Sequence, residues 1–172
     1  MVVCMAHSLR AFIEFKKKHK REVRALLFFT LSSVFLTFRY AFTAFGSNDY
    51  DLLPYARQFM DPDWIPRDWY LNLEIDYRCA FNFVAGILCK LLTFTDANTV
   101  GRIMIAVLYS VAFYRLARTL KLSSVLIVPL IFILAVEHRF FIANEWFLLK
   151  FEAKCFAYAL IILSISFLIE KK

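Results

Sequence analysis

The sequence predicts an all-helical membrane protein, a polytopic transmembrane helix bundle of four to five spans with amphipathic juxtamembrane helices in the first external loop. Of its 172 residues, 61% are hydrophobic and 20% are charged, whereas globular chains are about half apolar and about a quarter charged. Twenty Phe, against three Gly and four Pro, favour long apolar helices with few breaks. This composition excludes intrinsic disorder and an ordinary soluble domain.

The chain reads as a single membrane domain, residues 1–172, in four parts. Residues 1–24 form a basic leader, 25–46 are long enough for a first span, 47–79 form an external loop, and 80–172 hold the remaining spans. The leader is either a helix on the lipid surface or a solvated tail. Its many Lys and Arg residues predict a cytoplasmic N-terminus in a multi-pass protein of the plasma (inner) membrane.

The external loop is the longest polar stretch. Residues 47–78 carry seven acids and three Arg. Apolar residues recur at helical spacing over Leu52–Met60, which predicts a short amphipathic helix that ends at Asp61-Pro62. Trp and Tyr residues follow it, and because these side chains prefer the headgroup zone, we expect the loop to lie against the membrane surface.

Four further apolar stretches follow the loop: Ala80–Phe94, Ile103–Tyr114, Leu122–Val136 and Ala153–Ile169. Five alternating crossings would place the basic residues after Tyr114 outside, against the positive-inside rule. If Ala80–Phe94 instead folds back beside the bundle, those bases return to the cytoplasm. The strong apolar character of Ala80–Phe94 slightly favours five spans over four.

Two features near the outer end of the first span indicate chemistry. Arg39 lies within an apolar stretch, where it either snorkels to the interface or holds a phosphate group. Asp49 and Asp51 follow the span directly, and two neighbouring carboxylates can divide the roles of proton acceptor and ionised partner, or hold a divalent cation. Taken alone, an Asp-x-Asp in an external loop is more often solvated.

This layout resembles the N-terminal part of the GT-C superfamily, and the stretch 54–72 also looks like the loop of uncharacterised bacterial membrane proteins related to it. GT-C proteins transfer a sugar from a polyprenyl-phosphate donor to an extracytoplasmic acceptor. The resemblance implies that Asp49 is the catalytic base, that Asp51 is the second acid, and that amphipathic helices follow them. Arg39, Tyr50, Arg57 and Glu152 are the candidates for substrate binding, and the implied partners are the bilayer and a lipid-linked sugar donor.

Several alternatives stay open. Members of the superfamily usually have more spans, so the chain is a fragment, a split subunit or a reduced relative. It is a glycosyltransferase module if it is an enzyme, and otherwise a non-enzymatic membrane subunit with a membrane-protein partner. In a four-span arrangement His138, Glu145 or Glu152 would face Asp49. The three His residues are far apart and predict no metal cage, phosphate-loop and serine-hydrolase motifs are absent, and nucleic-acid binding is disfavoured.

Overall fold

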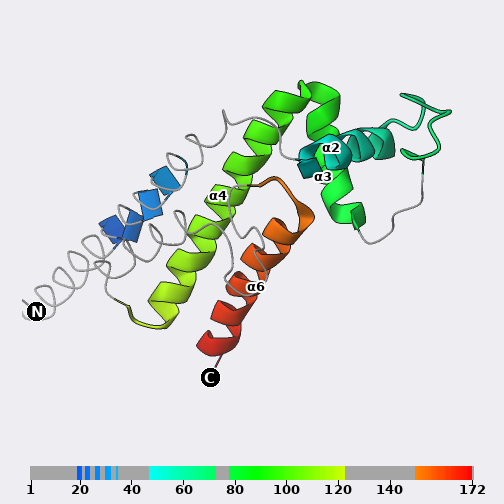
Figure 1. Ribbon diagram of the computed structural model, residues 1–172. Coiled ribbons are helices and arrows are strands. Elements are labelled where there is room, and N and C mark those ends of the chain that lie inside the picture. The colour runs from blue at the N-terminus through cyan, green and yellow to red at the C-terminus, as the bar shows by residue number, and fades with distance from the viewer. Residues whose placement is uncertain are drawn as a thin grey trace, which may run out of the picture.

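The computed structural model of the chain describes residues 47–72, 78–122 and 150–171, together with scattered positions between 19 and 34. Four helices are defined in it (Figure 1): α2 (Ser47–Met60), α3 (Cys79–Leu91), α4 (Phe94–Thr119) and α6 (Ala153–Glu170). No strand occurs among the described residues. The prediction of an all-helical chain is confirmed for this part of the molecule.

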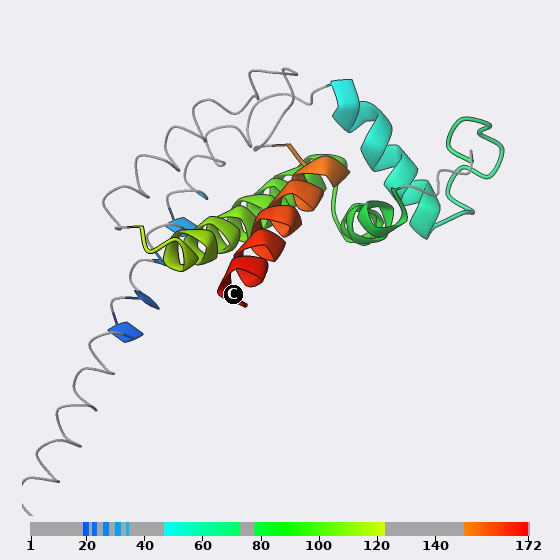
Figure 2. The ribbon, with the colours of Figure 1, turned by 90° about the horizontal axis from the view of Figure 1, so that it is seen from below.

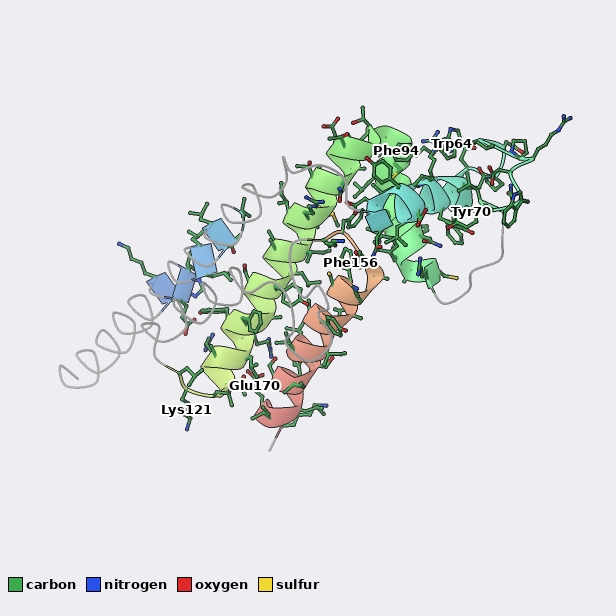
Figure 3. The ribbon with its side chains drawn as sticks, in the orientation of Figure 1. Trp64, Tyr70, Phe94, Lys121, Phe156 and Glu170 are labelled. Atoms are coloured by element: carbon green, nitrogen blue, oxygen red, sulfur yellow. The ribbon has the colours of Figure 1, made fainter. Side chains whose placement is uncertain are left out.

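Helices α4 and α6 run in the same direction and lie side by side in both views (Figures 1 and 2). At one end Gly101 of α4 faces the ring of Phe151, which lies two residues before α6. At the other end the Arg115 guanidinium lies 2.6 Å from the Glu170 carboxylate. Figure 3 shows Lys121 and Glu170 together at this second end. The two helices therefore share one end near α2 and α3, and a second, charged end away from them.

By length and composition, α4 and α6 are the two described helices that could cross a membrane. At the standard helical rise they are about 39 Å and about 27 Å long. Helix α6 matches the predicted stretch Ala153–Ile169. Helix α4 is longer than the predicted stretch Ile103–Tyr114. It begins nine residues earlier, at Phe94, where Thr93 caps it by accepting a hydrogen bond from the Asp96 backbone N–H.

Helix α3 is too short to cross a bilayer. Its 13 residues span about 20 Å, compared with a hydrocarbon core of about 30 Å. Lys90, near its end, is exposed. These facts favour the arrangement with four spans over the one with five. The expected spans at 25–46 and Leu122–Val136 lie largely or wholly outside the described residues, so the number of spans stays a prediction.

Helix α2 begins at Ser47, five residues before the predicted start at Leu52, and ends at Met60, directly before Asp61-Pro62 as expected. The additional turn is favoured because Asp49 lies at its positive N-terminal end. Helix α2 packs on α3, and a Cβ added at Gly86 would collide with the Ala56 carbonyl oxygen and the Met60 side chain. The absence of a side chain at Gly86 thus sets how closely α2 and α3 approach.

We expect Gly86→Ala to destabilise the fold by about 1–3 kcal/mol, the range for overpacking a well-filled core, because a backbone oxygen cannot rotate away from the new methyl group. The measurement is the thermal unfolding temperature of the purified protein in detergent. Lys90→Ala, an exposed change on the same helix, is the matched control. Equal unfolding temperatures for Gly86→Ala and the control would show that the two helices are not in this close contact.

Candidate functional site

A cavity of about 1040 Å³ lies between the start of α2, the start of α3 and the start of α6. Its polar lining residues are Asn48, Asp51, Tyr55, Tyr70, Arg78, Glu152 and Lys154. Its apolar lining residues are Leu52, Ala80, Phe81, Val84, Ala153, Phe156, Ala157 and Leu160. The cavity thus joins acids, bases and phenols to an apolar wall, and this combination is typical of ligand sites.

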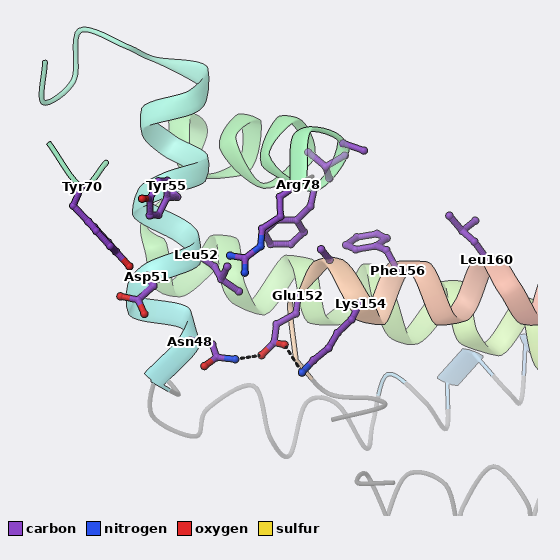
Figure 4. Close-up of a pocket in the computed structure, with 15 residues that line it drawn as sticks. Asn48, Asp51, Leu52, Tyr55, Tyr70, Arg78, Glu152, Lys154, Phe156 and Leu160 are labelled. Carbon is purple, nitrogen blue, oxygen red and sulfur yellow. Dashed lines mark hydrogen bonds and ion pairs between the residues drawn. The ribbon is translucent and has the colours of Figure 1, made fainter. Parts of the chain in front are cut away.

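The two kinds of lining are separated along the cavity. Figure 4 shows Tyr55, Tyr70 and Asp51 at one end, and Phe156 and Leu160 along α6 at the other. Arg78, Glu152 and Lys154 lie between them, and dashed lines mark the contacts of Glu152 with Asn48 and Lys154. A ligand that fits this cavity has a polar, charged part and an apolar part.

Glu152 is the buried acid at the middle of the cavity, with 4% of its surface exposed. It precedes the first residue of α6 as the N-cap. Its carboxylate accepts a hydrogen bond of 3.1 Å from the Asn48 side-chain amide and lies 3.2 Å from the Lys154 Nζ and 3.6 Å from the Lys150 Nζ. The carboxylate therefore links the starts of α2 and α6 and holds two cations beside the cavity.

Asp49 and Asp51 do not share one site. Residues two apart on a helix point to different sides, so Asp51 lines the cavity while Asp49 turns into the protein, with 1% of its surface exposed. The Asp49 carboxylate lies 3.2 Å from the Arg102 guanidinium and accepts a hydrogen bond of 3.3 Å from the Asn98 amide. Both partners are buried and belong to α4. Asp49 thus anchors α2 to α4, and Asp51 is the acid that a ligand can reach.

The remaining predicted site residues lie elsewhere. Tyr50 is 66% exposed and does not line the cavity. Arg57, near the end of α2, donates to the Cys89 carbonyl oxygen and pairs with Asp61. Arg39 lies outside the described residues, as do His138 and Glu145. Of the predicted site residues, Asp51 and Glu152 are therefore the two that the structure brings to the cavity.

Sequence reasoning missed Arg78, Arg102 and Asn98. Arg102 directly precedes the apolar stretch that starts at Ile103, so the sequence pattern does not mark it as a charge within a long helix. An arginine inside a candidate membrane span needs a partner, and this rule would have singled it out once the helix was known to begin at Phe94. Arg78 stands at the end of the loop, where no local pattern marks it.

No metal centre is apparent in the part of the chain that the structure describes, since no group of three or more His, Cys, Asp or Glu side chains gathers there. The predicted pairing of Asp49 and Asp51 around a divalent cation has no support from their positions, because Asp49 is held by Arg102. Charge compensation at the cavity comes instead from Arg78 and Lys154.

Tyr55, the phenol in the cavity wall, keeps its proton at neutral pH, as tyrosine ordinarily does. Burial raises its pKa above the ordinary value, and the nearby Tyr70 and Asp68 raise it further, whereas Arg78 lowers it in part. A neutral phenol can donate a hydrogen bond to a ligand oxygen as well as accept one.

We expect Arg102→Met to cost about 3–5 kcal/mol of stability, because it leaves the Asp49 carboxylate buried without its counter-charge. Replacing both partners, by Asp49→Leu with Arg102→Met, should recover most of that loss, because no buried charge is then unpaired. Denaturant unfolding of the three proteins in detergent tests this. If the single variant were as stable as the unmodified protein, the ion pair would not anchor α2 to α4.

Comparisons with known proteins give no relative from which the role of this site could be inferred. No protein-family model, curated protein or solved structure matches the chain. The function is therefore inferred from the shape of the cavity and from the chemistry of the side chains that line it.

Proposed function

We propose that this chain is a membrane glycosyltransferase module, similar to the GT-C superfamily, that transfers a sugar from a polyprenyl-phosphate donor to an acceptor outside the cytoplasm. The observation that carries the proposal is the cavity between α2, α3 and α6. It combines the acids Asp51 and Glu152 with the cations Arg78 and Lys154, and its apolar wall continues along α6. A donor of this class has a matching chemistry, with a sugar, a phosphate and a long hydrocarbon chain.

The cations supply the phosphate contacts in this proposal. Arg78 lines the cavity from the segment before α3 and Lys154 from the first turn of α6. Guanidinium and ammonium groups are the side chains that bind phosphate best. Lys154 is held near the cavity by its ion pair with Glu152. A phosphate between Arg78 and Lys154 would have two positive groups to stabilise its charge.

The hydrocarbon chain of the donor would lie along α6. Phe156 and Leu160 line the cavity from one side of this helix, and Leu160, Ile161 and Leu168 are exposed on its surface. In a bilayer an exposed apolar side of a helix contacts lipid. A prenyl chain therefore fits between the bilayer and the cavity without leaving an apolar environment.

The transfer step needs a base at the sugar end. The acceptor hydroxyl oxygen bonds to the anomeric carbon, and the bond from that carbon to the phosphate oxygen breaks. The phosphate leaves with the bonding electron pair, and Asp51 takes the hydroxyl proton. Arg78 and Lys154 stabilise the charge that develops on the departing phosphate. Asp49, the base that the resemblance implied, instead fixes the helix that carries Asp51.

The charge distribution supports an orientation with the cavity outside. Arg115, Arg118 and Lys121 gather at the far end of α4, and Lys171 follows α6 at the same end. Arg118 lies 3.4 Å from Glu22 of the basic leader. Cytoplasmic segments carry an excess of Lys and Arg, so this end faces the cytoplasm and α2 and α3 lie at the outer surface. The GT-C resemblance likewise implies juxtamembrane helices there.

Asp51→Asn is expected to reduce sugar transfer at least a hundredfold, the lower range for removal of a general base, with the fold retained because Asp51 is exposed. The assay follows transfer from labelled polyprenyl-phosphate sugar by the protein in liposomes. Asp63→Asn, an exposed acid outside the cavity, is the matched control and should transfer normally.

Equal transfer by Asp51→Asn and the control would contradict the role of Asp51. The non-enzymatic subunit becomes the better interpretation if two results are obtained together. No labelled donor supports transfer, and a membrane protein that co-purifies with the chain keeps its activity when the chain carries both Asp51→Asn and Glu152→Gln. The assay therefore separates the two functions.

The orientation makes an independent prediction with single-cysteine variants. A membrane-impermeant thiol reagent on intact cells should label a protein that keeps only Cys79, which is exposed at the start of α3. It should label a cysteine-free protein carrying Lys121→Cys only after the membrane is permeabilised. Labelling in the reverse order would place the cavity on the cytoplasmic side.

A protein that keeps only Cys89 is the control for access. This thiol is buried, and burial raises its pKa to about 11, although Arg57 nearby lowers it in part. Because only the thiolate reacts, Cys89 should stay unlabelled at neutral pH on either side of the membrane.

A further inference from the structure

Three aromatic rings lead from the cavity to the protein surface. The ring centroids of Tyr55 and Tyr70 are 5.0 Å apart, and those of Tyr70 and Trp69 are 5.8 Å apart, both in edge-to-face arrangements. Exposure increases along the row, from 7% at Tyr55 to 40% at Tyr70 and 77% at Trp69. The row therefore starts inside the cavity and ends at an indole that is open to solvent.

The loop that carries Tyr70 and Trp69 is fixed by hydrogen bonds from a buried side chain. The Gln58 amide, on α2, donates to the Pro62 carbonyl oxygen at 2.6 Å and to the Asn72 side-chain oxygen at 3.0 Å, and it accepts from the Ile65 backbone N–H at 3.0 Å. The Asp68 carboxylate accepts from the Leu71 backbone N–H at 2.8 Å. The aromatic groups are thus held in position before a ligand arrives, which lowers the cost of binding.

We propose that Tyr55, Tyr70 and Trp69, together with Asp51, form a subsite for a pyranose ring of the acceptor, so that the acceptor is a carbohydrate. A pyranose ring has an apolar face of C–H groups, which packs on an aromatic ring, and hydroxyl groups around its edge that need hydrogen-bond partners. Tyr and Trp provide both an apolar body and a polar group. The Asp51 carboxylate, in the same cavity, accepts from a sugar hydroxyl.

The position of this subsite agrees with the proposed function, on which the assignment to the acceptor rests. The aromatic end of the cavity lies away from Phe156 and Leu160, where the donor's hydrocarbon chain would lie (Figure 4). Arg78 and Lys154 lie between the two ends. A sugar hydroxyl held near Asp51 would therefore approach the anomeric carbon from the side opposite the prenyl chain.

An exposed Trp beside a membrane is also a common interfacial anchor. The contacts of Trp69 argue against that role here. The contact of Trp69 with Tyr70, which lines the cavity, directs the row toward a ligand instead.

The test is binding of three simple sugars, methyl α-glucopyranoside, methyl α-galactopyranoside and methyl α-mannopyranoside, to the full chain in phosphatidylcholine nanodiscs without glycolipid or sugar detergent. Titration followed by saturation-transfer NMR gives the Kd. We expect saturable binding of at least one sugar, a loss of about tenfold in affinity for Trp69→Ala, and near-normal binding for Trp69→Phe. Phe59→Ala, a change of an exposed aromatic residue of α2 outside the cavity lining, should bind as the unmodified protein does.

Three results would overturn the proposal. One is the absence of saturable binding of all three sugars, and another is equal affinity in Trp69→Ala and the unmodified protein. The third is quenching of tryptophan fluorescence by brominated lipid that disappears in Trp69→Ala, which would place this indole in the bilayer. None of these three measurements uses the lipid-linked donor. The proposed subsite can therefore be wrong while Asp51→Asn still abolishes sugar transfer. Conversely, saturable sugar binding that depends on Trp69 would support the subsite even if no donor supports transfer.

Discussion

A buried ion pair between Asp49 and Arg102 connects the start of α2 to the interior of α4, and the geometry of the cavity depends on it. A charge removed from water is tolerated only with a partner, so the two groups restrict how the two helices can pack. With Asp49 fixed toward α4, the helical repeat turns Asp51 to the opposite side and into the cavity. The ion pair of Asp49 with Arg102 thereby sets the position of Asp51.

A second polar contact completes the arrangement. Asn48 donates to Glu152, which is 104 residues further along the chain. Because Glu152 also pairs with Lys154, this contact brings an acid and a base from the start of α6 to the start of α2. The apolar core includes residues from all four helices that the structure describes, among them Leu53, Ala85, Ile105 and Cys155. The polar links near the cavity and this shared apolar core together hold the helices in their positions.

Much of the helical content could be predicted because it depends on local signals. The apolar run over Ala153–Ile169 predicts α6, and Asp61-Pro62 correctly predicts the end of α2. The sequence does not predict the separation of Asp49 from Asp51, because its pattern indicates a loop before Leu52 and the partner of Asp49 lies 53 residues further along the chain. Glu152 is a candidate from the sequence, whereas its contact with Asn48 joins residues 104 positions apart, which no local pattern indicates.

The apolar surface of α6 also determines how a ligand would reach the cavity. Leu160 belongs to the cavity wall and to the exposed side of the helix at once, so no polar barrier separates the hydrocarbon region from the wall at this point. A compound dissolved in the bilayer would reach the cavity by lateral diffusion. Its occupancy of the cavity would then depend on its mole fraction among the lipids and not on its molarity in water. Diluting the membrane with inert phospholipid should then weaken occupancy, while diluting the aqueous suspension should not.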